Sequence, residues 1–216
     1  RVASLEVKDQ PIVDGYLSKL LDNCQVARTS LQKVLQIHHV RHHILQYSLI
    51  NLNKFVSELY QKTAASFTSQ DVIPQFTLDC DDDLYLETDT ELLTLVLQSF
   101  LKNAIQYALP LSDSYTRVIV EHSEETGIQI TVQDNGEGVL PELQTKLFTM
   151  FFRGHETKSG TGLDLYIARL SAERLQGTVE YHPKPDRTCF RLALPTLEDH
   201  LVTNESQANI HSSPAS

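Results

Sequence analysis

The sequence has little positive charge and no long apolar run, and each shortage excludes a class of protein. Its 216 residues carry 18 Lys and Arg against 28 Asp and Glu, a formal net charge of −10. Sequence-independent binding of nucleic acid requires a basic face, so we expect no nucleic-acid partner. No apolar run approaches the roughly 18 residues of a membrane span. The chain opens with Arg1 rather than methionine, so we expect a piece of a longer protein, with any membrane segment upstream.

Cysteine is also scarce. Cys24, Cys80 and Cys189 are odd in number, widely spaced and free of CxxC spacing. Such cysteines are typical of reduced packing residues in a cytosolic protein, not of a disulfide framework or a zinc site. We therefore expect a cytoplasmic chain.

The first part of the sequence predicts one long helix over residues 14–45, with Asp14 as its N-cap. Apolar residues recur there at alternating spacings of four and three, at Val13, Leu17, Leu20, Cys24, Ala27, Leu31 and Val34, before polar His38. This average of 3.5 residues is typical of a coiled-coil seam. We favour a helix from a dimeric bundle over a helix that packs only on its own domain.

After this helix the patterns alternate between helix and strand. Helices are predicted over 51–67, 89–108 and 163–175, and strands over 73–80, 84–86, 116–122, 128–133, 178–182 and 188–194. Asp89 is the predicted N-cap of the second of these helices. The tail from residue 196 is polar and without periodicity, which is typical of disorder.

Three separated segments carry side chains suited to chemistry. Asn103 lies at the edge of a buried helical stripe, one turn from Ser99 and Tyr107, and its amide oxygen suits a hard cation such as Mg²⁺. Asp134 directly follows a strand and precedes two glycines, so its carboxylate can accept a hydrogen bond from an exocyclic amine. Taken singly, a solvated asparagine and a polar turn explain these two segments as well.

The third segment, residues 154–165, combines glycines, small hydroxyl residues and Lys158 before a helix start. Backbone N–H groups and the helix dipole bind phosphate in such an arrangement. The segment is not a Walker loop, because it lacks GxxxxGK[ST], nor a dinucleotide GxGxxG between parallel strands.

These segments occur in the order and spacing of four family motifs. LKNAIQYA (101–108), DNGEGV (134–139), LFTMFFRG (147–154) and GTGLDLYIA (160–168) resemble the asparagine, first glycine, phenylalanine and second glycine boxes of sensor histidine kinases. The superfamily also includes gyrase-type ATPases and Hsp90-type chaperones, and the similarity covers residues 51–195. It implies an α+β fold, a two-layer α/β sandwich of the Bergerat type, with a mixed sheet and helices on one face. The long coiled-coil-like helix precedes it.

The resemblance assigns roles at the adenine end of an ATP site. It implies that Asn103 binds a Mg²⁺ ion that bridges the phosphates and that Asp134 binds the adenine amino group. Gly136 and Gly138 are expected to shape the adenine pocket, and Tyr107 to line it.

The resemblance also assigns the phosphate end. Phe148, Phe152 and Arg153 are expected to anchor a short lid over residues 155–160, whose terminal glycines suit hinge motion. The expected phosphate contacts are Gly160, Thr161, Gly162 and Leu163.

Three positions depart from the family pattern. Ser99 and Gln106 stand where many kinases carry an asparagine and a lysine, and Asp164 replaces the last glycine of GTGLGL. A carboxylate some 4 Å from phosphate costs between ~1 and ~4 kcal/mol, depending on solvation. Asp164 can instead cap the helix and point away. The first interpretation predicts weak nucleotide affinity.

The phosphoacceptor motif, a histidine followed by an acidic residue and a proline, is absent. His38, His39, His42 and His43 lack a following acidic residue and lie where the second helix of a dimerisation hairpin is expected. Their one-turn spacing permits metal binding, although a solvated polar face is the simpler interpretation. The resemblance thus implies a partial dimerisation helix over 1–47, a catalytic ATP-binding domain over 48–195 and a disordered tail over 196–216.

The resulting functional prediction is a histidine kinase fragment that binds ATP and Mg²⁺, forms a homodimer through its first helix and serves a response regulator. The γ-phosphoryl group would pass to a histidine outside this chain, mainly through positioning and charge neutralisation. The alternative is a degenerate kinase domain that acts as a binding module. A non-kinase clamp or chaperone is disfavoured, because it needs a longer lid and a transducer domain.

Overall fold

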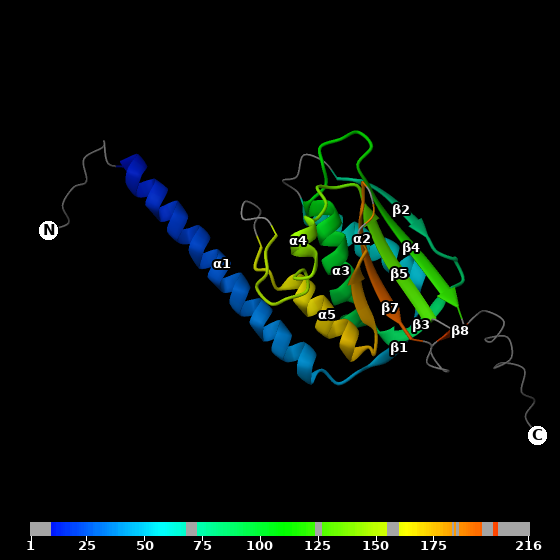
Figure 1. The fold of residues 1–216 in the computed structure, drawn as a ribbon. Coiled ribbons are helices and arrows are strands. Elements are labelled where there is room, and N and C mark those ends of the chain that lie inside the picture. The colour runs from blue at the N-terminus through cyan, green and yellow to red at the C-terminus, as the bar shows by residue number, and fades with distance from the viewer. Residues whose placement is uncertain are drawn as a thin grey trace, which may run out of the picture.

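The computed structural model describes residues 10–67, 73–123, 127–154, 160–182, 184, 186–195 and 201–202 (Figure 1). Its elements in chain order are α1 (Gln10–His42), β1 (Tyr47–Asn51), α2 (Leu52–Ala65), β2 (Gln75–Asp79), β3 (Tyr85–Asp89), α3 (Thr90–Gln106), β4 (Tyr115–Ser123), β5 (Gly127–Asp134), α4 (Pro141–Gln144), α5 (Asp164–Arg174), β6 (Thr178–Tyr181), β7 (Thr188–Leu194) and β8 (Leu201–Val202).

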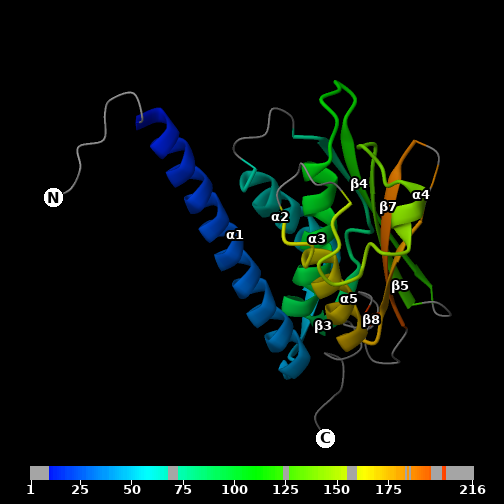
Figure 2. The same cartoon turned by 60° about the vertical axis from the view of Figure 1, so that its left-hand side comes forward.

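The main body has two layers, a sheet and the helices packed on one of its faces (Figures 1 and 2). The sheet has the order β2-β4-β5-β7-β6, with β2 parallel to β4 and the remaining pairs antiparallel. Helices α2, α3 and α5 lie on one side, and the core between the layers includes Leu97, Phe100, Ile130 and Leu192, all buried. The predicted α+β fold with a mixed sheet is confirmed.

A second, small sheet of order β1-β3-β8 lies at one end of the body. β1 was not predicted from the sequence, and β3 was predicted without a pairing partner; the acidic turn Asp81-Asp82-Asp83 lies between β2 and β3. β2 and β3 flank that turn but belong to different sheets, so they do not form a hairpin. β8 lies inside the tail expected to be disordered, where Leu201 pairs with Leu86; residues 196–200 and 203–216 lie outside the described part.

Side-chain caps fix the starts of two helices. The Leu92 N–H donates to Asp89 Oδ1 over 3.0 Å, as predicted for α3, and the Lys54 N–H donates to Asn51 Oδ1 over 2.9 Å at α2. The prediction for α1 was wrong at its start: the helix begins at Gln10, so exposed Asp14 lies within it rather than at its cap.

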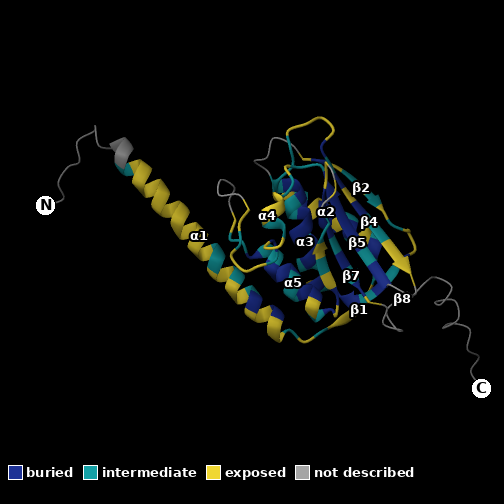
Figure 3. Cartoon of the chain, viewed as in Figure 1, coloured by how far each residue is buried: buried dark blue, intermediate teal, exposed yellow. Residues whose placement is uncertain are grey.

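Helix α1 presents two different stripes. Ile37 and Val40, close to its C-terminal end, are buried where the helix packs against α5. The seam residues Leu20 and Leu31 are 59% and 66% exposed, and most of the helix stands clear of the body (Figure 3). At about 100° per residue, Val40 lies roughly 120° around the helix from Val34, whereas Ile37 lies roughly 60° from it, so the docked stripe adjoins one edge of the seam. The end of α1 thus packs on its own chain while its seam stays exposed.

Two further observations concern the environment of the chain. Within the described ranges, no helix combines the length and the apolar character needed to cross a membrane. Cys24, Cys80 and Cys189 are free thiols, of which Cys24 is exposed and Cys189 buried.

Candidate functional site

A cavity opens on the helical side of the main sheet, between the C-terminal end of α3 and the N-terminal end of α5. It collects residues that are far apart in the sequence. The predicted site residues that line it are Asn103, Tyr107, Asp134, Gly138, Phe152, Arg153, Gly160 and Gly162. Gly136, Thr161 and Leu163 lie next to it without lining it.

Asp134 supplies a buried carboxylate at one end of the cavity. It ends β5, where its Oδ1 accepts a hydrogen bond of 2.9 Å from the Gly136 N–H. Burial raises the pKa of Asp134 to about 6, although the hydrogen bonds from Gly136 and Thr188 lower it. Among the residues that the structure describes, no cation offsets the burial of this carboxylate, so it can accept a further hydrogen bond from a ligand donor.

A backbone contact holds this end of the cavity together. The Glu137 N–H donates to the carbonyl oxygen of Tyr107, at the C-cap of α3, over 3.0 Å. A Cβ at Gly136 would lie 2.4 Å from the same oxygen, so the close approach excludes any side chain at Gly136. Gly138 has φ +73°, a conformation that other residues rarely adopt. The turn after β5 is therefore fixed against α3.

Asn103 places an amide group on the cavity wall. It lies on α3, is partly buried and lines the cavity together with Gln106. Ser99, one turn earlier, is buried, does not line the cavity, and its Oγ is without a hydrogen-bond partner among the described residues. Mg²⁺ prefers hard oxygen ligands and keeps several waters, so one amide oxygen beside the substrate phosphates fits this ion.

The opposite end of the cavity is a glycine turn at the start of α5. Gly162 has φ +68°, and a Cβ there would lie 2.6 Å from the carbonyl oxygen of Phe152. Leu163 is buried and forms the N-cap position of α5 without a side-chain hydrogen bond. The Thr161 hydroxyl is buried and, among the described residues, unpaired. This turn therefore keeps polar groups close to a helix N-terminus, where anions are stabilised.

The phenylalanine segment is divided between core and cavity. Phe148 packs edge-on against Phe190, with ring centroids 6.1 Å apart, whereas Phe152 and Arg153 line the cavity. Phe151 between them has φ 62° and is 59% exposed. Of the lid expected over residues 155–160, residues 155–159 lie outside the described part of the chain.

For Asp164 the structure contradicts one of the two alternatives, the helix cap. It does not cap α5, whose N-cap is Leu163, and it does line the cavity. Its Oδ1 forms an ion pair of 2.6 Å with Nζ of Lys33, on α1. Lys102 lies near this pair. Burial lowers the pKa of Lys102 and the positive charge of Lys33 lowers it further, whereas the negative charge of Asp164 raises it. The carboxylate at the cavity is thus partly neutralised from α1.

The sequence analysis missed much of the cavity wall. The apolar lining comes from Val139, Leu140, Leu143, Leu147 and Leu165, and from Phe190. Thr188 was missed as well, although it lines the cavity and lies opposite Asp134 in the β5–β7 register. The strand that holds Thr188 was predicted, but its register against β5 has no signal in the sequence.

Known proteins resemble this chain in sequence. The family described as "Histidine kinase-, DNA gyrase B-, and HSP90-like ATPase" matches residues 88–198. The "Sensor-like histidine kinase SenX3" of Mycobacterium tuberculosis (strain ATCC 25618 / H37Rv) is 31% identical over 153 residues, 68% of this chain and 36% of SenX3. The chain therefore spans about a third of the length of this relative.

Solved structures resemble it in fold. The nucleotide-free catalytic domain of histidine kinase ThkA has 25% identity and a TM-score of 0.58, covering 69% of this chain and 97% of that one. ThkA in complex with response regulator protein TrrA has 21% identity and a TM-score of 0.61, covering 91% of this chain and 53% of that one. The second likeness, at this identity, shows the fold alone.

Proposed function

Because the chain belongs to the family of histidine kinase-, DNA gyrase B- and HSP90-like ATPases, we propose that its cavity binds ATP with Mg²⁺ as the catalytic domain of a sensor histidine kinase. One observation carries the proposal: the cavity joins a buried carboxylate at Asp134, an amide at Asn103 and a glycine turn at a helix N-terminus. In the longer protein, the γ-phosphoryl group passes to a histidine outside this chain.

Each end of the cavity then has its own task. Asp134 accepts a hydrogen bond from the adenine amino group, while Tyr107, Gly136 and Gly138 shape the surrounding pocket. Asn103 holds Mg²⁺, which when bound neutralises charge on the phosphates. The chain itself mainly positions the nucleotide and excludes water from it.

The phosphate end works through backbone groups. The N–H groups of the turn before α5 and the dipole of α5 bind the phosphates. Phe152 and Arg153 anchor the lid over them. The phosphate contacts belong to Gly160, Thr161, Gly162 and Leu163.

Calorimetric titration with ATP and Mg²⁺ tests this proposal. Asp134→Ala removes the buried acceptor, so we expect ATP affinity to fall by about tenfold or more, since a site built for a hydrogen bond loses it. Glu142→Ala is the matched control, because Glu142 is an exposed carboxylate beside the cavity that does not line it. Absent binding, or equal affinity in Asp134→Ala and the wild type, would refute the site.

The exposed seam of α1 supports a homodimer in the intact protein. Leu17 and Leu20 are 52% and 59% exposed, although the docked end of the same helix is buried on α5. We assign residues 1–47 to dimerisation, 48–195 to catalysis and 196–216 to a tail. Leu20→Glu together with Leu31→Glu should convert dimer to monomer in sedimentation velocity; a dimer that persists in this variant contradicts the assignment.

Two further assignments concern the setting of the kinase. A response regulator is the proposed partner, as in the ThkA complex with TrrA, and the likeness in fold extends over 91% of this chain. A cytoplasmic location is proposed because ATP is supplied there, and the exposed thiol of Cys24 suits a reducing compartment.

A second candidate function, a degenerate domain that binds nucleotide weakly, rests on Asp164. Its carboxylate lines the cavity, and Gln106 supplies no cation there. If this interpretation holds, Asp164→Gly raises ATP affinity by about fivefold or more, the effect of removing about 1 kcal/mol of repulsion. Unchanged affinity in this variant removes the reason for the second candidate.

A further inference from the structure

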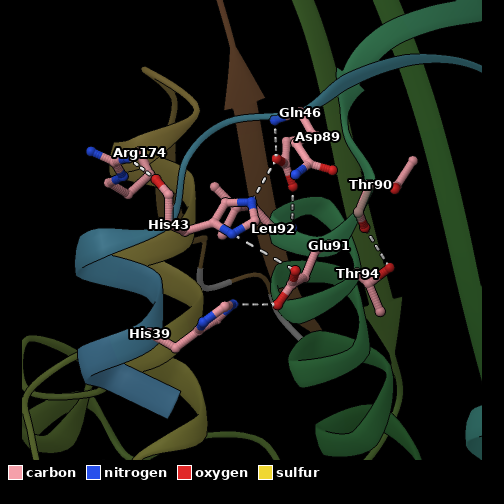
Figure 4. Close-up of polar contacts among 9 residues, drawn as sticks. All are labelled: His39, His43, Gln46, Asp89, Thr90, Glu91, Leu92, Thr94 and Arg174. Carbon is pink, nitrogen blue, oxygen red and sulfur yellow. Dashed lines mark hydrogen bonds and ion pairs between the residues drawn. The ribbon is translucent and has the colours of Figure 1, made fainter. Parts of the chain in front are cut away.

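A second cluster of ligand-type side chains lies where the end of α1 meets the start of α3, outside the cavity (Figure 4). His39 Nε2 is 2.8 Å from Glu91 Oε1, and His43 Nδ1 is 3.8 Å from Glu91 Oε2. One ligand atom from each of the three residues lies within 4.8 Å of the other two. We propose that His39, His43 and Glu91 bind a transition-metal ion such as Zn²⁺.

The hydrogen bond from His43 to Asp89 decides which nitrogen of His43 faces the cluster. His43 Nε2 lies 2.7 Å from Asp89 Oδ2, and both side chains are buried. The Asp89 carboxylate also accepts hydrogen bonds from the Gln46 N–H over 2.7 Å and from the Leu92 N–H over 3.0 Å. Its oxygens act as acceptors here, so Nε2 of His43 carries the hydrogen of their contact.

The other ring nitrogen of His43, Nδ1, therefore faces Glu91. In a neutral imidazole this nitrogen is an acceptor, and the Glu91 carboxylate is an acceptor as well. Two acceptors that face each other are stabilised by a donor or a cation between them: a proton on the imidazole, a water that donates to both, or a metal ion. Figure 4 shows both imidazole rings directed toward the Glu91 carboxylate from one side.

The spacing and the chemistry of the ligands favour a metal ion of the zinc class. Bonds of about 2.1 Å at tetrahedral angles separate ligand atoms by roughly 3.4 Å, between the two distances to Glu91. Two imidazoles and one carboxylate suit Zn²⁺, Co²⁺ or Ni²⁺, whereas Mg²⁺ prefers oxygen ligands alone. Histidines that bind a metal through one ring nitrogen commonly donate a hydrogen bond to a carboxylate through the other, which orients the ring. The hydrogen bond that His43 Nε2 donates to Asp89 is of this kind.

A neighbouring pair of histidines provides an internal comparison. His38 and His42 have the same one-turn spacing, but their rings stack with centroids 4.3 Å apart, and His42 Nδ1 bonds the carbonyl oxygen of His38. Among the residues that the structure describes, the only group of three such ligands is that of His39, His43 and Glu91. Both histidine pairs have the same spacing, but only His39 and His43 lie beside a carboxylate from α3, that of Glu91.

A bound ion would join two elements that are far apart in the sequence. His39 lies on α1, His43 directly follows it, and Glu91 lies in the first turn of α3. Three bonds to one ion would hold the end of α1 on the catalytic body, beside the bond from Arg174 to the carbonyl oxygen of His43. Binding should therefore also raise the melting temperature of the chain.

The experiment is a titration of the chelator-treated chain with Zn²⁺, and with Co²⁺ monitored by visible absorption, both without nucleotide. We expect one ion per chain. His39→Gln and Glu91→Gln should each weaken binding about tenfold or more; both side chains are 52% exposed, so these variants should fold. His38→Gln is the matched control and should bind within about twofold of the wild type.

Three results would overturn the proposal: no binding to the wild-type chain, unchanged affinity in His39→Gln and Glu91→Gln, or an equal loss in His38→Gln. If a proton on His43 rather than a metal ion lies between His43 and Glu91, the wild-type chain will not bind the metal. ATP titration of His39→Gln separates this question from the function of the cavity, because that variant should bind ATP as the wild type does.

Discussion

The two ends of the cavity are held in different ways. At the proposed adenine end, Asp134 is buried with no cation against it among the described residues, and Gly136 lies directly against the carbonyl oxygen of Tyr107. At the phosphate end, Asp164 is 38% exposed and paired with Lys33, which belongs to α1. The residues at the proposed adenine end therefore all belong to the main body. At the proposed phosphate end, the charge of Asp164 is offset by Lys33, so it depends on the position of α1.

The largest expected effect is the pH dependence of the adenine end. The folded-state pKa of Asp134 is raised from 3.8 to about 6 by burial. The protonated Asp134 carboxyl is therefore favoured in the folded state. Its contribution to the free energy of unfolding is fully present below pH 3.8 and is lost as the pH rises through about 6. This loss amounts to about 3 kcal/mol at most.

Asp134→Asn tests this effect. The amide is neutral at every pH and can still accept from the Gly136 N–H, so the variant should be more stable than the wild type at pH 7.5 but not at pH 4. Urea unfolding of both proteins at the two pH values measures it. A stability difference that does not change with pH contradicts the raised pKa.

The next effect concerns the backbone contact at the same end. Gly136→Ala places a Cβ 2.4 Å from the Tyr107 oxygen, so the turn must move. We expect a loss of about 1–3 kcal/mol in the free energy of unfolding, typical of overpacking, together with weaker ATP binding. Gly160→Ala is the control for the stability loss alone, because no described atom lies within 4 Å of a Cβ there and its φ is not positive. Equal losses in both variants would erase the contrast between the two ends.

The smallest effect tests the dependence on α1. Lys33→Met leaves Asp164 unpaired, and partly exposed ion pairs contribute about 0.2–1 kcal/mol, so ATP affinity should fall up to about fivefold. In the Asp164→Asn background the same change should have little effect, because no carboxylate is left to neutralise. A loss that persists there would mean that Lys33 contacts the phosphates directly, and Lys19→Met provides the control on the exposed part of α1.

Local patterns were sufficient for most elements. The apolar stripe and the cap at Asp89 predicted α3 closely, because helical periodicity and capping depend only on neighbouring residues. β1 was missed because its first three residues are exposed, and an edge strand of this kind lacks alternation. The predicted seam of α1 did not include Ile37 and Val40, which α5 buries.

Tertiary partners were not predictable in the same way. The motifs identified Asp134 and Asp164, but the pairing with Lys33 joins α1 to α5, and nothing in either segment encodes the other. The cluster of His39 and Glu91 has the same origin: histidine spacing was visible in the sequence, while the carboxylate arrives from α3. Such contacts follow from the packing of α1, which no single sequence window determines.

The docked end of α1 makes the rest of the helix a lever arm. Its 33 residues extend about 50 Å at 1.5 Å per residue. A tilt of about 10° about the docked end moves the far end by roughly 9 Å. Lys33 lies close to the docked end, so the same tilt displaces it much less. A shift of about 2 Å at Nζ of Lys33 would lengthen its 2.6 Å contact with Asp164 beyond ion-pair distance, so a mechanical input at the far end would change the charge beside the proposed phosphate site.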